Sequence, residues 1–162
     1  SRGVGPPIHR RPPLAPGQVA PMTSDDDCVF CGIVRGELPS STIARTDRAM
    51  AFMDINPVTQ GHALVIPNVH AVDLHDVSPD DLAACIHLSQ DVAARARARL
   101  GADGVNLFQC TGADAWQTVF HFHIHVIPRY RDQPDKDGTI RLPWDPTPGD
   151  MDEIRRIGDL LA

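Results

Sequence analysis

Three histidines alternate with apolar residues in the segment 117–127, which reads QTVFHFHIHVI. Side chains of an extended strand point alternately to opposite faces, so His121, His123 and His125 share one face while Phe122 and Ile124 share the other. Imidazoles titrate near neutrality and repel one another when charged, so three in a row pack poorly. An exposed polar face of an edge strand is the bland interpretation. Metal ligation and attack by a neutral imidazole nitrogen are the two chemical ones.

A Cys-x-x-Cys pair, Cys28 and Cys31, offers a second group of reactive side chains. Alone, such a pair is equally consistent with a redox site, two packed thiols or half of a metal site. Together with His70 and His121 it makes a Cys2His2 set, the tetrahedral donor set of structural zinc, with His75 as the substitute for His70. Zinc would then tie the N-terminal segment to the histidine segment and fix His121.

The elements that must position these residues indicate an α+β domain. Strands are predicted over 43–54, 61–67, 105–109 and 118–127, where apolar residues cluster between glycine and proline signals. A long helix is predicted over 79–100, because Ser78 suits an N-cap, Pro79 the first turn and Gly101 the helix end. Cys85 falls on the buried side of this helix. A short amphipathic helix is expected to start near Thr147.

Length and charge exclude several classes of protein. The chain has 162 residues, enough for one compact domain, with 42% hydrophobic and 22% charged residues. Its formal charge of −6 argues against a nucleic-acid coat or a binder of anionic membrane surfaces. No apolar run approaches the roughly 18 residues that span a bilayer. Four cysteines are too few for a disulfide scaffold, so we expect a cytoplasmic protein whose thiols are free or metal-bound.

Composition divides the chain into three segments. Residues 1–22 hold six prolines, three glycines, three arginines and no acid, which predicts a disordered extension. Met22 is the last residue of this segment, and we expect it to be the natural start. Residues 23–130 form the predicted folded domain, and residues 131–162 a C-terminal extension with the short amphipathic helix.

Several motifs together resemble the histidine triad (HIT) family. The segment 121–127 matches the triad pattern His-φ-His-φ-His-φ-φ, where φ is apolar, and Gln117 stands four residues before it. The segments 51–57 (AFMDINP) and 61–67 (GHALVIP), followed by His70, match in order and spacing. The resemblance covers about 28–130. It implies a HIT-like fold: an antiparallel sheet of about five strands, one long helix and a short C-terminal helix, paired as a homodimer.

The resemblance also implies a chemistry and a role for each matching residue. Members of the family bind small nucleotides, and the middle triad histidine, here His123, attacks the α-phosphorus. His125 is expected to donate to the phosphate or the leaving group, His62 to steady the triad, and Gln117 to hydrogen-bond the phosphate. Asp54 is expected to hold ribose hydroxyls. Some of the remaining substrate-binding positions form a purine pocket, although packing in the core is an equal alternative to ligand contact for the apolar ones. These remaining positions are Phe30, Ile33, Phe52, Met53, Ile55, Cys110 and Thr118.

Some relatives hold zinc on ligands that match Cys28, Cys31, His70 and His121, so the resemblance implies structural zinc. Two positions depart from the family pattern. Cys110 stands where relatives often carry an amide near the phosphates, and Trp116 replaces a small residue, often glycine. An indole at Trp116 would narrow the leaving-group side or stack on a second base or an acyl adenylate.

The expected activity is hydrolysis of a nucleoside phosphoramidate, an acyl adenylate or a dinucleoside polyphosphate through a covalent histidine–nucleotidyl intermediate. A nucleotidyl transferase or phosphorylase, or a nucleotide-binding protein without turnover, remain the alternatives. An intact set of His123, His125 and Gln117 favours an enzyme.

Overall fold

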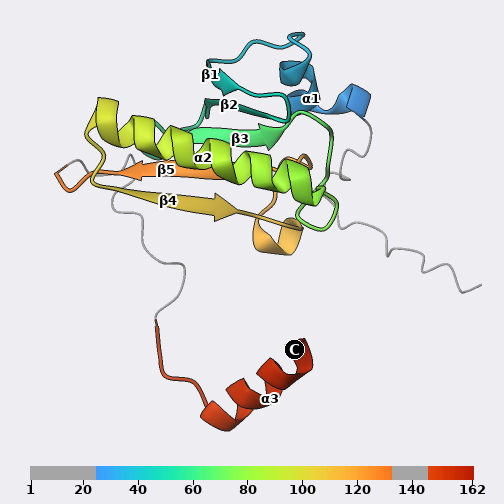
Figure 1. Cartoon of the computed structure of the whole chain (residues 1–162), viewed down its shortest axis with the longest axis vertical. Coiled ribbons are helices and arrows are strands. Elements are labelled where there is room, and N and C mark those ends of the chain that lie inside the picture. Colours follow the sequence, from blue (N-terminus) through green and yellow to red (C-terminus); the bar gives the residue numbers. More distant parts are fainter. Residues whose placement is uncertain (1–24, 133–145) are drawn as a thin grey trace, which may run out of the picture.

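A five-stranded antiparallel sheet with the strand order β1-β2-β3-β5-β4 forms the centre of the molecule (Figure 1). The structure is a computed structural model that describes residues 25–132 and 146–162. The strands are β1 (Thr42–Arg45), β2 (Ala49–Met53), β3 (Ala63–Pro67), β4 (Gly104–Gln109) and β5 (Ile124–Arg129). The helices are η1 (Asp25–Asp27), α1 (Val29–Val34), α2 (Pro79–Leu100), η2 (Ala113–Ala115) and α3 (Met151–Leu161). The predicted α+β class is confirmed, as are the predicted antiparallel sheet of five strands, the long helix and the short C-terminal helix.

One face of the sheet is covered by α2 (Figure 1). Ser78 caps the helix by accepting a hydrogen bond from Asp81 N–H, Pro79 occupies the first turn, and Gly101 ends the helix in the left-handed conformation. Both predicted helix boundaries are therefore confirmed. The helix packs Cys85 and other apolar residues against the sheet, and the whole cluster contains Ala49, Ala51, Ala63, Val65, Ala71, Val77, Cys85, Leu88, Val92, Phe122, Ile124 and Val126.

The opposite face of the sheet carries a second apolar cluster beneath α1. Strand alternation turns Phe52 and Leu64 to this face, while their neighbours Ala51 and Val65 turn toward α2. The cluster comprises Cys28, Phe30, Cys31, Met50, Phe52, Leu64 and Ile66. The histidines of the triad lie beside this cluster, so α1 brings the cysteine pair to the face that carries them.

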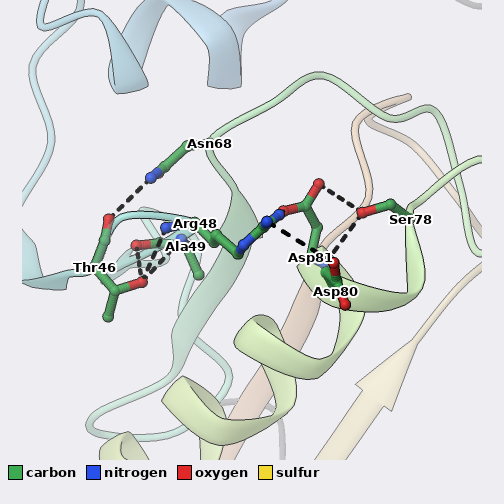
Figure 2. A network of polar contacts seen from close by, with 7 residues as sticks. All are labelled: Thr46, Arg48, Ala49, Asn68, Ser78, Asp80 and Asp81. Carbon is green, nitrogen blue, oxygen red and sulfur yellow. Dashed lines mark hydrogen bonds and ion pairs between the residues drawn. The ribbon is translucent and has the colours of Figure 1, made fainter.

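A polar network fastens the start of α2 to the turn between β1 and β2 (Figure 2). Arg48 in that turn donates to Asp81 at 2.9 Å, and Asp81 also accepts from the Ser78 hydroxyl at 2.8 Å. Thr46 closes the turn by accepting from Ala49 N–H at 3.0 Å. Because Ser78 and Arg48 both favour the carboxylate, they hold the pKa of Asp81 below its usual value. These contacts fix the orientation of α2 on the sheet.

Two predicted strands are corrected by the structure. The segment 43–54 contains two strands, since Thr46 turns the chain between β1 and β2. The segment 118–127 is extended only from Ile124 onward. Residues before Ile124 instead bond to the loop that follows β3: Phe122 N–H donates to Ala71 C=O, and the Gln117 amide donates to Val72 C=O at 2.7 Å. These bonds replace the ladder that a longer β5 would need.

The C-terminal helix begins later than predicted, at Met151, because the Asp150 carboxylate caps it by accepting from the N–H groups of Asp152 and Glu153. All residues of α3 are exposed. The predicted disorder of residues 1–22 lies outside the described residues, as does the segment 133–145 of the C-terminal extension. None of the described helices combines the length and apolarity that a membrane crossing requires.

Candidate active site and metal centre

His123 lies just before β5 with a fixed tautomer. Its Nδ1 lies 2.7 Å from the carbonyl oxygen of His121. Because a carbonyl can only accept, Nδ1 carries the proton, and the neutral ring keeps its lone pair on Nε2. Burial lowers the pKa of His123 and favours this neutral form. The main chain therefore presents Nε2 of His123 as a nucleophilic nitrogen.

His62 and His125 form a directed pair beside it. Val58 N–H donates to Nδ1 of His62 at 3.2 Å, so the neutral ring carries its proton on Nε2. That Nε2 lies 2.9 Å from Nδ1 of His125, which must accept, and His125 then holds its own proton on Nε2. Burial lowers the pKa of His62 and brings that of His125 to about 4. Both histidines are therefore neutral, and His125 can donate a hydrogen bond from its Nε2–H.

Asp54 completes this group at the end of β2. One carboxylate oxygen accepts from Asn56 N–H at 2.8 Å. The other lies 3.4 Å from Nε2 of His62 and 3.9 Å from Nδ1 of His125. The carboxylate is mostly buried, and its charge opposes the effect of burial on the pKa of both histidines. Residues just after β2, just before β3 and within β5 therefore meet at one polar cluster.

The four predicted zinc ligands also come together. The ligand atoms of Cys28, Cys31, His70 and His121 all lie within 4.8 Å of one another. Nδ1 of His121 is 3.4 Å from Sγ of Cys28, and Nδ1 of His70 is 3.2 Å from Sγ of Cys31. The edges of a tetrahedron around zinc, with its usual bonds to sulfur and nitrogen, are roughly 3.5 Å long. The prediction of a Cys2His2 metal-capable group is confirmed, with His70 rather than the exposed His75.

The surroundings of the cluster suit a cation. The Pro67 carbonyl lies 3.0 Å from Nε2 of His121, which therefore carries the proton and turns the Nδ1 lone pair toward the sulfurs. Nε2 of His70 is buried and has no hydrogen-bond partner among the described residues. Burial and the neighbouring Cys28 raise the pKa of the Cys31 thiol to about 12. A soft divalent cation would supply the positive charge that this buried thiol needs to ionise.

Gln117 holds the loop that precedes the triad. Its amide oxygen accepts from Gly112 N–H at 2.7 Å, and its amide nitrogen donates to the carbonyls of Val72 and Val119 at 2.7 and 3.2 Å. Both ends of the buried amide are therefore occupied by main-chain groups. The expected contact of Gln117 with a phosphate remains a prediction.

The predicted base-pocket residues have different surroundings. Phe30 and Phe52 are buried and pack edge to face, with centroids 5.4 Å apart. Phe30 also contacts the ring of His123, at 5.4 Å between centroids. Ile33 and Met53 are half-buried, Cys110 is buried and Thr118 is exposed, whereas Ile55 is 91% exposed. The structure thus brings Phe30 and Phe52 to the triad and places Ile55 at the surface.

Sequence reasoning missed one aromatic residue near the triad, Phe108. It lies opposite His125 in the pairing of β4 with β5, and their ring centroids are 6.5 Å apart. Trp116 stacks on Phe108 with centroids 6.1 Å apart and planes inclined by 18°. A lone phenylalanine in a strand gives no sign of such a pairing, because the register that creates it is a tertiary property.

The fold and the site together define a narrow class of protein, in which a five-stranded sheet carries alternating histidines beside a Cys2His2 cluster. Comparison with known proteins agrees with this class. The HIT domain family model matches residues 35–132. An adenosine 5′-monophosphoramidase from Saccharomyces cerevisiae is 38% identical over 144 residues, which are 88% of this chain and 86% of that protein. The chain belongs to the HIT family.

Two solved structures support the same assignment. A HIT family protein from Bacillus anthracis superposes with a TM-score of 0.75 at 33% identity, covering 84% of this chain and 95% of that one. A zinc-bound histidine triad family protein from Mycobacterium smegmatis superposes with a TM-score of 0.67 at 39% identity, covering 74% and 86%.

Proposed function

We propose that the protein hydrolyses nucleoside phosphoramidates, releasing a nucleoside monophosphate and an amine, with adenosine as the nucleoside. The observation that carries the proposal is the tautomer of His123, whose Nε2 lone pair is held free by the bond from Nδ1–H to the His121 carbonyl. The similarity to an adenosine 5′-monophosphoramidase supports the choice of the P–N bond.

The reaction proceeds through two displacements at the α-phosphorus. Nε2 of His123 forms a bond to phosphorus as the bond from phosphorus to the amine nitrogen breaks. Nε2–H of His125 donates a hydrogen bond to the departing nitrogen, which takes up a proton from solvent, because an amine anion is too basic to leave without one. Water then attacks the phosphorus and gives its proton to solvent, and the bond to His123 breaks with release of the nucleoside monophosphate.

Other residues bind and position the substrate. Asp54 accepts hydrogen bonds from the ribose hydroxyls, and His62 sets the tautomer of His125. Gln117 fixes the loop next to the phosphate site through its bonds to Gly112 and Val72. Phe30 and Phe52 form the buried wall against which a purine base packs, and Ile33, Met53, Ile55, Cys110 and Thr118 complete the substrate site.

Zinc is the proposed structural cofactor. Cys28, Cys31, His70 and His121 would hold it, and the bound ion would supply the charge that stabilises two buried thiolates. The zinc-bound relative from M. smegmatis supports this assignment. The site fixes α1 and His121, and the displacement steps need only His123 and His125.

We also propose a homodimer that forms along the edge strand β4 and the adjoining helix α2. Strand β4 forms one edge of the sheet, and its residue Leu107 is 48% exposed. An open strand edge with an apolar residue is a site for pairing with a second copy. None of the four cysteines, all of which the structure describes, forms a disulfide, which suits a cytoplasmic protein in a reducing compartment.

The test is a turnover assay with adenosine 5′-phosphoramidate. The wild type should release AMP and ammonia, and His123→Ala should lose essentially all activity while still binding AMP. His87→Ala, which changes an exposed histidine on α2, is the matched control and should keep wild-type turnover. The absence of AMP release by wild type would overturn the proposed function and favour a nucleotide-binding protein. Release that requires added phosphate would instead indicate a phosphorylase.

A further inference from the structure

The aromatic pair formed by Phe108 and Trp116 is unusual in its backbone. Trp116 has φ 70° and ψ 20°, and it is the only non-glycine residue with a positive φ in the described part of the chain. A bulky side chain in this left-handed conformation is strained, and such strain tends to persist where a function requires it. A glycine would adopt the same conformation without strain.

The loop that carries Trp116 is held closely enough to maintain this conformation. Ala115 N–H and Gln117 N–H both donate to the Gly112 carbonyl, at 3.0 and 3.1 Å, and Trp116 N–H donates to Ala113 at 3.0 Å. Gly112 N–H in turn donates to the amide oxygen of Gln117 at 2.7 Å. The indole is therefore positioned in advance by its own loop.

Burial does not explain this arrangement. Trp116 is 61% exposed and Phe108 is 39% exposed. If these aromatic side chains served only to fill the core, they would be buried. If these positions served only to keep the surface soluble, polar residues would be expected there. The two rings lie nearly parallel, so a third planar ring can continue the stack on their open faces.

The position of the pair relative to the triad indicates which part of a substrate it meets. Phe52 and Asp54 lie on β2 and at its end, whereas Phe108 lies on β4, on the other side of β5 (Figure 1). The proposed nucleoside side is therefore separated from the aromatic pair by the strand that carries His125. An in-line displacement expels the leaving group on the side of the phosphorus opposite Nε2 of His123, and the ring of Phe108 lies 6.5 Å from that of His125, which is proposed to donate to this group.

We propose that Phe108 and Trp116 form a stacking subsite for a planar aromatic group on the leaving group of the nucleotide substrate. This inference rests on the proposed function and narrows its substrates to adenylates whose departing part carries an aromatic ring. The aromatic ring could belong to an amine leaving group or to a second nucleobase. Measuring turnover of a dinucleoside polyphosphate beside the phosphoramidates described below distinguishes these two sources.

The test compares two adenosine phosphoramidates, one of 2-phenylethylamine and one of 2-cyclohexylethylamine, whose amines are similar in basicity and size. The wild type should prefer the phenyl compound in kcat/KM by roughly fivefold, as expected for one aromatic stack. The ratio should fall to about one in Trp116→Gly and remain intermediate in Trp116→Phe. Leu160→Ala on the exposed helix α3 is the control and should keep the wild-type ratio.

Binding separates a failure of the subsite from a failure of the proposed hydrolase. In a His123→Ala background, calorimetry should show tighter binding of the phenyl compound, and adding Trp116→Gly should abolish the difference. If no compound is hydrolysed but this difference persists, the hydrolase assignment fails and the subsite stands. A wild-type ratio near one, or an unchanged ratio in Trp116→Gly, would overturn the subsite.

Thermal stability distinguishes the subsite from a structural role. Since glycine relieves the strain at position 116, Trp116→Gly should be at least as stable as the wild type. A fall in Tm or in oligomeric mass with an unchanged preference would show that the indole serves packing or contact with a second copy, and would also overturn the proposal.

Discussion

Nε2 of His62 lies 2.9 Å from Nδ1 of His125, and a main-chain group decides which atom carries the proton. Val58 N–H occupies Nδ1 of His62, so Nε2–H of His62 donates to His125. His125 then keeps its proton on Nε2. A backbone amide thus determines the state of a side chain two hydrogen bonds away, as required for a residue that must donate to a leaving group.

Replacing His62 with phenylalanine should impair the step that needs a proton donor. We expect kcat for an adenosine phosphoramidate to fall about 100-fold, in the range typical of general-acid catalysis. A 4-nitrophenyl ester of AMP, whose leaving group needs no proton, should lose far less. His62→Gln, which can donate through its amide, should recover part of the loss. Equal losses for both substrates would show that His62 does not act through His125.

Acid should destabilise the fold through its buried neutral histidines. His125 takes up a proton near pH 6.5 when unfolded but only near pH 4 when folded, because burial lowers its pKa. The unfolded chain therefore binds more protons between these values, and the free energy of unfolding falls as the pH drops through the window. From pH 7 to pH 5, His125 alone should account for about 2 kcal/mol.

Urea unfolding at pH 7 and pH 5 measures this effect. His62 also has a lowered pKa and acts in the same direction, so the wild type should lose more than the contribution of His125. His125→Asn should show a smaller loss between the two pH values. A pH dependence as steep as that of the wild type would contradict the assignment to His125.

Removing metal should loosen α1 and the cysteine pair. Because burial and Cys28 raise the pKa of Cys31 to about 12, zinc binding at pH 7 must displace a thiol proton. Adding zinc to chelator-treated protein should acidify a weakly buffered solution and raise Tm by roughly 10 °C. Cys31→Ser should abolish both responses. A Tm that chelators and zinc leave unchanged would exclude a structural zinc site.

Gly61 tests how the turn before His62 is built. It has φ +85°, and a Cβ there would lie 2.6 Å from Cδ1 of Leu100 and 3.3 Å from Cγ of Pro128. Gly61→Ala should therefore destabilise the fold by about 2 kcal/mol and reduce turnover through displacement of His62. Gly36→Ala is the matched control, since its φ is +76° but nothing lies within 4 Å. Equal effects of the two substitutions would show that backbone strain alone decides.

Local patterns in the sequence were enough to predict the fold class, and the resemblance to the HIT family added the zinc ligands. The boundaries of α2 followed from Ser78, Pro79 and Gly101, because capping chemistry acts within a few residues. The Cys2His2 group followed from donor types and family spacing. The start of β5 did not, since it depends on bonds from Gln117 and Phe122 to the loop after β3.

Register and backbone conformation account for what the sequence could not predict. Phe108 faces His125 because of the pairing of β4 with β5, and no local pattern encodes that register. The sequence marked Trp116 as a departure from the family pattern, but not its left-handed backbone or its stack on Phe108. Likewise, the tautomers of His62 and His123 depend on main-chain groups whose positions only the fold determines.

Intact-mass spectrometry of protein quenched during turnover of an adenosine phosphoramidate shows directly whether His123 forms a covalent intermediate. Wild-type protein should carry the added mass of one adenylyl group, and His123→Ala should show no such species. The same measurement on His125→Asn, which should slow both displacements, shows whether formation of the adduct depends on the hydrogen bond from His125. Rapid AMP release by wild type without any adduct on His123, or turnover by His123→Ala at the wild-type rate, would contradict covalent catalysis at this residue.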